Sequence, residues 1–513
     1  MRALLLAVIA LPTAILAKPP VATTEYGKVA GASEQSVDVF RGIPFAAPPV
    51  GANRWRAPQP PAKWKGLRNA TSFGPDCMQI QFPGDQAPLR TTPSEDCLYL
   101  NLWKPAAAKA GAKLPVLVWI YGGAFMFGGT SPEIYDGKAF AKEGVIFVSL
   151  NYRVGRFGFF SHPALTAEAG KPVGNFAMQD QVAALQWVRN NISRFGGDPA
   201  RVTVMGESAG GTAVVNLLTM PSARGLLSGA IVMSGGGRSL MPTKSMAHAE
   251  QVGINFAAKN GIAATGAEGL AAMRALPAQS VRGTNLVSDI FANPSTYTGG
   301  FMAEGSVLTG QSDDLMDAGA ILPVPVMIGS TNADEGITFA KDKQSLFSSF
   351  GNHSDALRRL YDADGTADFR TVSRALTGDH YMAEPARFVA RHAVAAGQKA
   401  FFYRFGYVAE AMRSTWRAGA PHATDIPYFF NTIDARHGAS TTEQDRKAAR
   451  LALAYVVNFA RKGDPNGPSL PIWPAYDRKG DALLQFDINA SAEAVRDPAK
   501  DRLDALEAVA THP

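Results

Sequence analysis

The sequence predicts an α/β fold in which a mostly parallel central sheet is flanked by helices and carries large lid or cap insertions. Three observations lead to this prediction. Strand-like apolar runs alternate with helical patterns, several of these runs are apolar on both faces, and one intervening segment has an apolar stripe at helical spacing. The chain has 513 residues, 46% of them hydrophobic and 18% charged, so it has enough material for a large core.

Six segments have the strand pattern, and they are 114–120, 145–150, 202–205, 230–233, 325–328 and 400–405. A helix is expected between the second and third of them. There, Met178, Val182, Leu185, Val188 and Ile192 fall within a stripe of about 120°. The alternation of strand and helix favours parallel strands joined by right-handed crossovers.

The chain shows no internal repeat and no linker long enough to mark a domain boundary, so a single domain over residues 18–513 is predicted. Residues 242–315 have helical patterns and few strand signals. We expect this segment to be an insertion that covers the sheet and shapes a substrate pocket.

Residues 1–17 have the pattern of a signal peptide, with Arg2 ahead of an apolar run and Ala17 as the small residue at the cut. The run is too short to cross a membrane, Pro12 interrupts it, and no later stretch reaches the ~20 apolar residues of a spanning helix. A secreted or periplasmic protein without a membrane span is therefore predicted, with a retained N-terminal anchor as the alternative.

The net charge of +6 is spread along the chain without a block of like charges. Neither a zinc-finger spacing nor an aromatic–basic RNA motif is present, so no nucleic-acid partner is expected. Nothing in the sequence indicates an oligomeric state.

Cys77 and Cys97 are the only cysteines. In an exported protein an even pair suggests one disulfide, and two free buried thiols are the alternative. The pair alone cannot build a metal site and no HExxH motif occurs, so neither a metal nor a cofactor is expected.

The segment RVTVMGESAGG predicts a nucleophile elbow, in which a strand from Val202 runs into Gly206-Glu207-Ser208-Ala209-Gly210 and helix-forming residues follow to Leu218. Glycines two residues before and after the serine allow a tight turn. Ser208 is therefore the candidate nucleophile, exposed at the positive end of a helix.

An oxyanion hole needs backbone N–H donors, which a glycine-rich loop after a strand can supply. The residues Tyr121-Gly122-Gly123-Ala124-Phe125 follow the strand at 114–120 and fit this description. Ala209, directly after the nucleophile, is expected to add a further donor.

A serine nucleophile needs a histidine base that a carboxylate orients, and in such folds the chain order is serine, acid, histidine. Asp334 and Glu335 follow the strand at 325–328, and from the residues alone both remain candidates for the acid. The histidines beyond them are His353, His380, His392, His422, His437 and His512. His422 is favoured because it lies in the loop GAPHATDIPYFF after the strand at 400–405.

These residues resemble the type-B carboxylesterases, the cholinesterase-like serine esterases, over nearly the whole chain. The shared motifs are FRGIPFAAPPVGANRW, SEDCLYLNLW, WIYGGAF, NYRVGRFGFF, the run from GNFAMQDQ to GESAGG, NADEGITF, APHATDIPYFF, and NFARKGDPN with WPAY.

The resemblance implies an α/β-hydrolase fold, the hydrolysis of a small-molecule carboxylic ester, and a triad of Ser208, Glu335 and His422. Glu335 is chosen over Asp334 because it matches the family's acid. The implied oxyanion hole consists of the N–H groups of Gly123, Ala124 and Ala209. The resemblance also pairs Cys77 with Cys97.

The sequence departs from the family's pattern at three points. Ala124 replaces a usual glycine, which keeps the N–H but adds a methyl group. The segment between the two cysteines has no tryptophan for a choline cation, so choline esters are not expected. Two further disulfides of animal relatives are absent, which suggests a bacterial protein.

Arg90 and Arg238 fall in segments that could face the pocket. They suggest a preference for esters that bear carboxylates, although both residues could be surface charges. Two other functions remain as alternatives: an amidase or lactonase that uses the same triad, and a non-catalytic binding protein.

Overall fold

The fold is built on one large sheet. The computed structural model describes residues 18–511, except 83–84, 237, 239–241 and 284–294. The sheet has eleven strands in the order β14-β13-β12-β11-β10-β9-β7-β8-β6-β4-β3. Its strands are β3 (Ala32–Glu34), β4 (Val37–Pro44), β6 (Tyr99–Pro105), β7 (Leu114–Ile120), β8 (Ile146–Leu150), β9 (Gly197–Glu207), β10 (Gly229–Met233), β11 (Val326–Thr331), β12 (Ala400–Phe405), β13 (Ala482–Phe486) and β14 (Ala492–Arg496). A second sheet joins β1 (Val21–Thr23), β2 (Lys28–Ala30) and β5 (Leu67–Asn69).

The middle of the large sheet is parallel. Neighbouring strands from β8 to β13 run in the same direction, whereas the pairs β3–β4, β4–β6, β6–β8 and β13–β14 are antiparallel. The predicted mostly parallel sheet is confirmed, and the six predicted strands are β7 to β12. Because parallel strands end at the same edge, the loops after β7, β9, β11 and β12 meet there.

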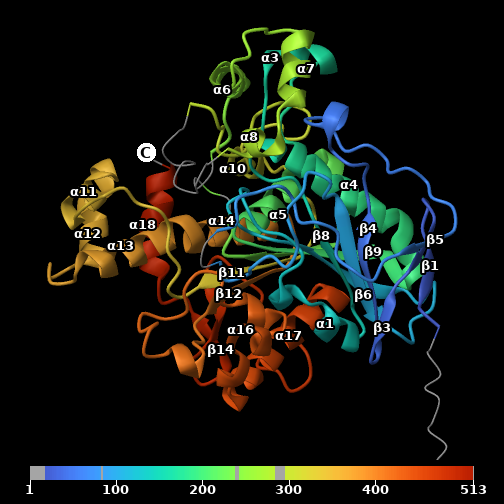
Figure 1. Cartoon of the computed structure of the whole chain (residues 1–513). Coiled ribbons are helices and arrows are strands. Elements are labelled where there is room, and N and C mark those ends of the chain that lie inside the picture. The colour runs from blue at the N-terminus through green and yellow to red at the C-terminus, as the bar shows by residue number, and fades with distance from the viewer. Residues whose placement is uncertain (1–17, 83–84, 237, 239–241, 284–294, 512–513) are drawn as a thin grey trace, which may run out of the picture.

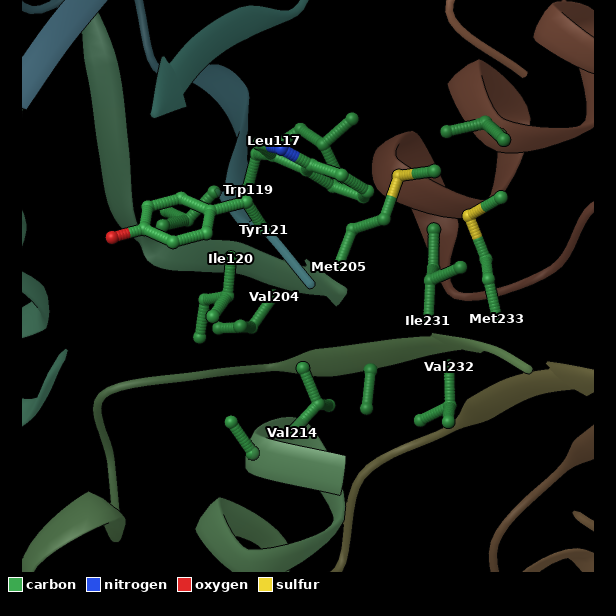
Figure 2. Close-up of a cluster of buried hydrophobic side chains, with 14 of the residues drawn as sticks. Leu117, Trp119, Ile120, Tyr121, Val204, Met205, Val214, Ile231, Val232 and Met233 are labelled. Atoms are coloured by element: carbon green, nitrogen blue, oxygen red, sulfur yellow. The ribbon is translucent and has the colours of Figure 1, made fainter. Parts of the chain in front are cut away.

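The central strands are buried on both faces, which explains their continuous apolar sequences. Figure 2 shows Trp119, Met205 and Ile231 on one face of the sheet and Val204 and Val232 on the other. Alternate residues of a strand point to opposite faces, so each strand contributes to two layers of core.

Helices cover both faces. The helix α5 (Ala209–Thr219) packs on β9 and β10, and α14 (Glu384–Ala395) packs on β11 and β12. On the opposite face, Trp119 contacts Phe430, which follows α15 (Ile426–Phe429), and α17 (Glu443–Lys462) packs on β7 and β9. The helix predicted after the second strand is α4 (Phe176–Asn191). The other helices outside the insertion are α1 (Lys138–Lys142), α2 (Gly155–Gly158), α3 (Pro163–Ala169), α11 (Lys343–Ser348), α12 (Ser354–Tyr361), α13 (Phe369–Gly378), α16 (Ile433–His437) and α18 (Lys500–Thr511).

The described part of the predicted insertion is helical, with α6 (Met246–Lys259), α7 (Ala267–Ala275), α8 (Ala278–Arg282) and α10 (Ser312–Asp317). Figure 1 shows these helices gathered at one end of the molecule. The helical character expected of 242–315 is therefore confirmed for its described residues, but none of them lines the cavity over Ser208.

Cys77 and Cys97 form a disulfide, as predicted. No helix in the described ranges combines the length and apolarity that crossing a membrane requires. The predicted signal peptide, 1–17, lies outside the described residues.

Candidate active site

Ser208 lies on the sharp turn between β9 and α5, as the motif predicts. Its φ of 54° and ψ of −126° are unusual for a residue with a side chain, and its N–H donates to Met233 O at 2.9 Å. A Cβ added at Gly206 would lie 2.3 Å from Gly210 O, and one added at Gly210 would lie 2.1 Å from Ile120 O. Both glycines are therefore required by the close approach of three backbone segments.

His422 faces Ser208 from the loop after β12. Its Nε2 lies 2.9 Å from Ser208 Oγ, and its Nδ1 lies 2.7 Å from Asp334 Oδ1. With the Nδ1 proton donated to the carboxylate, Nε2 is free to accept the serine proton. Of the histidines proposed from the sequence, His422 is the one that contacts Ser208.

The carboxylate beside His422 belongs to Asp334, not to Glu335. Asp334 is 4% exposed, whereas the Glu335 side chain is 54% exposed and pairs with Arg374 at 2.6 Å. The structure therefore places Asp334 beside His422, where the resemblance implied Glu335. Ala333 N–H donates to Ala420 O, which ties this loop to the histidine loop. Asp334 is thereby buried beside His422, while the Glu335 side chain lies at the exposed border of the cavity and contacts Arg374.

The remaining candidate histidines are not among the described residues that line the cavity over Ser208. His392 contacts Asp317 at 3.0 Å, His437 packs near Trp416, and burial lowers the pKa of His380 to about 4. His353 ends a short 3₁₀ helix, and His512 lies outside the described residues.

The loop after β7 lies beside Ser208, since a Cβ added at Gly122 would be 3.0 Å from Ser208 Cβ. Gly123, Ala124 and Ala209 line the same cavity as Ser208 and His422. Within the described chain, the amides of Gly123 and Ala124 donate no hydrogen bond, and Ala209 opens a helix, where amides lack intrahelical acceptors. The predicted loop thus supplies free donors at the nucleophile, as an oxyanion hole requires.

Ala124 has a φ of 52°, a left-handed conformation that glycine adopts more readily. The conformation is held by the next residue, because Gly155 N–H donates to Phe125 O at 2.6 Å and the Phe125 ring packs on Phe159 and Phe301. The Ala124 methyl group therefore lies in the wall of the cavity over Ser208.

The cavity over Ser208 has a volume of about 400 Å³. The disulfide loop contributes Phe82, Asp85 and Ala87 to its wall, and the segment after Asp334 contributes Ile337. Its charged lining side chains are acidic; among the described lining residues there is no lysine or arginine.

Arg90 and Arg238 do not line this cavity. Arg90 is exposed and lies 3.9 Å from Glu133. Arg238 is 9% exposed, pairs with Glu384 at 3.2 Å and covers the Phe388 ring. The substrate contact predicted for these two arginines is not seen in this cavity.

Glu207, inside the GESAG motif, is a buried acid that the sequence analysis did not assign. Its Oε1 lies 3.3 Å from His422 Nε2 and has no hydrogen-bond partner among the described residues. Burial raises the pKa of Glu207 to about 8, although His422 opposes this effect. The position of Glu207 directly before Ser208 in the sequence is the signal that could have identified this residue.

The charges around His422 act on its pKa in opposite directions. Burial alone would lower the pKa of the ring, but the carboxylates of Asp334 and Glu207 outweigh it and raise that pKa to about 10. Burial tends to raise the pKa of Asp334, but His422 holds it below its ordinary value. The imidazolium form of His422 is therefore strongly stabilised.

Comparison with known proteins gives consistent matches over the chain. The model of the carboxylesterase family matches residues 18–504. Fumonisin B1 esterase of Sphingopyxis macrogoltabida is 35% identical over 501 residues, which cover 92% of this chain and 88% of that protein. Para-nitrobenzyl esterase of Bacillus subtilis (strain 168) is 34% identical over 507 residues, with 95% and 98% covered. Carboxylesterase 5A of Homo sapiens is 34% identical over 505 residues, with 91% and 84% covered.

Proposed function

The chain belongs to the carboxylesterase family, and we propose that it hydrolyses carboxylic esters through an acyl-enzyme on Ser208. The observation that carries this proposal is the line of contacts from Ser208 Oγ through His422 to Asp334 Oδ1. This line borders a cavity of about 400 Å³, which is large enough for a small ester.

In the first step, His422 Nε2 takes the proton of Ser208 as Oγ attacks the ester carbonyl carbon. The carbonyl oxygen gains negative charge, which the amides of Gly123, Ala124 and Ala209 stabilise. The protonated ring then donates its proton to the departing alkoxide, so an alcohol leaves and the acyl group stays on Ser208.

In the second step, water takes the place of the alcohol. His422 accepts a proton from the water, whose oxygen attacks the acyl carbon, and the ring then returns that proton to Ser208 Oγ as the acid is released. Asp334 stays ionised throughout, holds the ring tautomer and stabilises the imidazolium. Glu207 lies on the Nε2 side of the ring, and its carboxylate, when ionised, adds to the stabilisation of the imidazolium.

The Cys77–Cys97 disulfide also supports export, since such bonds persist in oxidising compartments. We therefore propose a periplasmic or secreted location. Detection of the protein in the periplasmic fraction, with 1–17 removed, would support this location; its recovery intact from the cytosol would contradict it.

The test of the activity combines covalent labelling with kinetics. We expect a fluorophosphonate probe to label the wild type but not Ser208→Ala. We also expect the variant to hydrolyse a p-nitrophenyl ester about 10⁴-fold or more slowly. Activity of Ser208→Ala close to the wild type would refute the proposed role of Ser208. A matched anilide that is cleaved as fast as the ester would instead indicate an amidase.

A further inference from the structure

A second, smaller cavity adjoins the one over Ser208. Its volume is about 50 Å³, and Phe82 and Phe127 line both cavities. The two rings stack with centroids 5.3 Å apart and an angle of 10° between their planes. This pair of rings thus forms a wall that the small cavity shares with the cavity over Ser208.

Arg156 lines the small cavity and is 4% exposed. Its guanidinium donates to the carbonyl oxygens of Val281 and Thr296 and lies 4.5 Å from the centre of the Phe256 ring. These contacts hold the guanidinium of α2 against the cap through carbonyl oxygens and an aromatic ring.

The charge of Arg156 has no carboxylate partner among the described residues, and its hydrogen bonds all go to backbone carbonyl oxygens. A buried cation without an anion is unusual because desolvation destabilises the charged form. Burial lowers the pKa of Arg156 to about 10, so the group is still a cation at neutral pH. An anion in the small cavity would offset this unfavourable burial.

Tyr297 also lines the small cavity, and its hydroxyl is a second polar group there that lacks an acceptor or donor partner among the described residues. Its side chain is 1% exposed. Burial raises the pKa of this phenol, so the hydroxyl stays protonated and can donate. Arg282 also lines the cavity and adds a second positive charge.

We propose that the small cavity is an anion subsite that binds a carboxylate carried by the ester substrate, with Arg156 and Tyr297 as its donors. This inference rests on the proposed ester hydrolysis and names its substrate class. A carboxylate fits because it is small and planar and accepts charge-assisted hydrogen bonds from a guanidinium. The preference suggested by the sequence for esters that bear carboxylates would then depend on Arg156 rather than on Arg90 or Arg238.

The experiment compares p-nitrophenyl half-esters of succinate, glutarate and adipate with p-nitrophenyl esters of methyl-ended acids of the same chain lengths. We expect kcat/KM to be at least about ten-fold higher for the carboxylate ester at one of these lengths, since tenfold corresponds to one good charged hydrogen bond. Both esters of a pair are measured on the same protein sample. The ratio of their kcat/KM values is therefore independent of the fraction of the protein that is folded.

Three variants then assign the effect. Arg156→Gln should reduce the ratio about ten-fold, and Tyr297→Phe should reduce it several-fold because only one hydroxyl is lost. Arg156→Lys keeps the charge and should retain part of the preference. Arg90→Gln, an exposed arginine outside both cavities, serves as the matched control and should leave the ratio unchanged.

Several outcomes would overturn the inference while leaving ester hydrolysis intact. One is a ratio near one at every length in the wild type, and another is a ratio that both Arg156→Gln and Tyr297→Phe leave unchanged. Inhibition by free acetate or glutarate without any ester preference would show binding of free anions only. Asp289 belongs to 284–294, outside the described residues. A preference that appears only in Asp289→Asn would show that the chain itself supplies the anion. Failure to hydrolyse any ester would instead reject the proposed function.

Discussion

At the scale of single residues, the acid of the triad can be tested directly. Asp334 is buried beside His422 Nδ1, so Asp334→Asn keeps the shape of the side chain but removes the charge that holds the ring tautomer. We expect kcat for a neutral p-nitrophenyl ester to fall by ~10⁴-fold, the loss that such a replacement causes in serine hydrolases.

The neighbouring glutamate provides the matched control. Glu335 is more than half exposed and pairs with Arg374, so Glu335→Gln should change kcat by less than about two-fold. If Glu335→Gln lost far more kcat than Asp334→Asn, Glu335 would be the acid instead.

Glu207 gives a prediction about pH. The ring of His422 must be neutral to accept the serine proton, so kcat/KM rises with pH as the ring loses its proton. Asp334 and Glu207 raise the pKa of His422, and Glu207→Gln removes one of these charges. The ring should then lose its proton at lower pH, which moves the acid limb of the kcat/KM profile down by about one unit. An acid limb at its wild-type position would contradict the electrostatic role of Glu207.

The sequence indicated Ser208 and His422 because each lies in a motif whose neighbours restrict the backbone. The sequence did not determine in the same way which acidic residue lies beside His422. Asp334 and Glu335 are consecutive, and which of them points inward depends on the hydrogen bond between Ala333 and Ala420. That contact joins segments far apart in the chain, and no local pattern reveals it.

At the scale of elements, the disulfide loop links stability to the pocket. The bond between Cys77 and Cys97 closes a loop that carries Phe82 and Asp85 to the cavity. We expect the double variant Cys77→Ser/Cys97→Ser to lose ~3 kcal/mol of unfolding free energy, measured by urea denaturation. Its KM should rise more than its kcat changes, since the described residues of the loop line the pocket and form no hydrogen bond with Ser208, His422 or Asp334.

The wild type treated with a reductant should behave like the double variant, and an unchanged denaturation midpoint would contradict this role of the loop.

The strands that the sequence predicted are the buried central ones, whose continuous apolar runs give a strong signal. The edge strand β14 has mostly exposed side chains and lacks this signal. A π-helix at Asp379–Ala383, between α13 and α14, was also missed. Its extra residue per turn shifts the helical periodicity, and it places Met382 in the cavity wall.

At the scale of the whole molecule, a buried arginine connects distant segments. Arg387 of α14 is 1% exposed and contacts Asp504 of α18 at 2.7 Å and Asp481 at 3.7 Å. Arg387→Met should lower the unfolding free energy by about 1.5–3 kcal/mol, because Asp481 and Asp504 lose one cationic partner while Lys500 still lies 3.6 Å from Asp481. Thermal and urea denaturation measure this loss.

The exposed pair between Arg446 and Asp434 gives the comparison, and Arg446→Met should leave the denaturation midpoint unchanged. Equal effects of the two substitutions would show that the contacts of Arg387 add no stability.

The left-handed alanine of the oxyanion loop has a consequence for how this enzyme can change its selectivity. At Ala124 one methyl group both occupies a strained backbone position and narrows the space beside Ser208. Any larger side chain at this position would increase the backbone strain and would also fill the space beside Ser208. Glycine is therefore the one substitution that we expect position 124 to tolerate. New acyl preferences must therefore arise at other residues of the cavity wall, such as those of the disulfide loop and of the segment after Asp334, where side chains can be exchanged without altering the backbone donors beside Ser208.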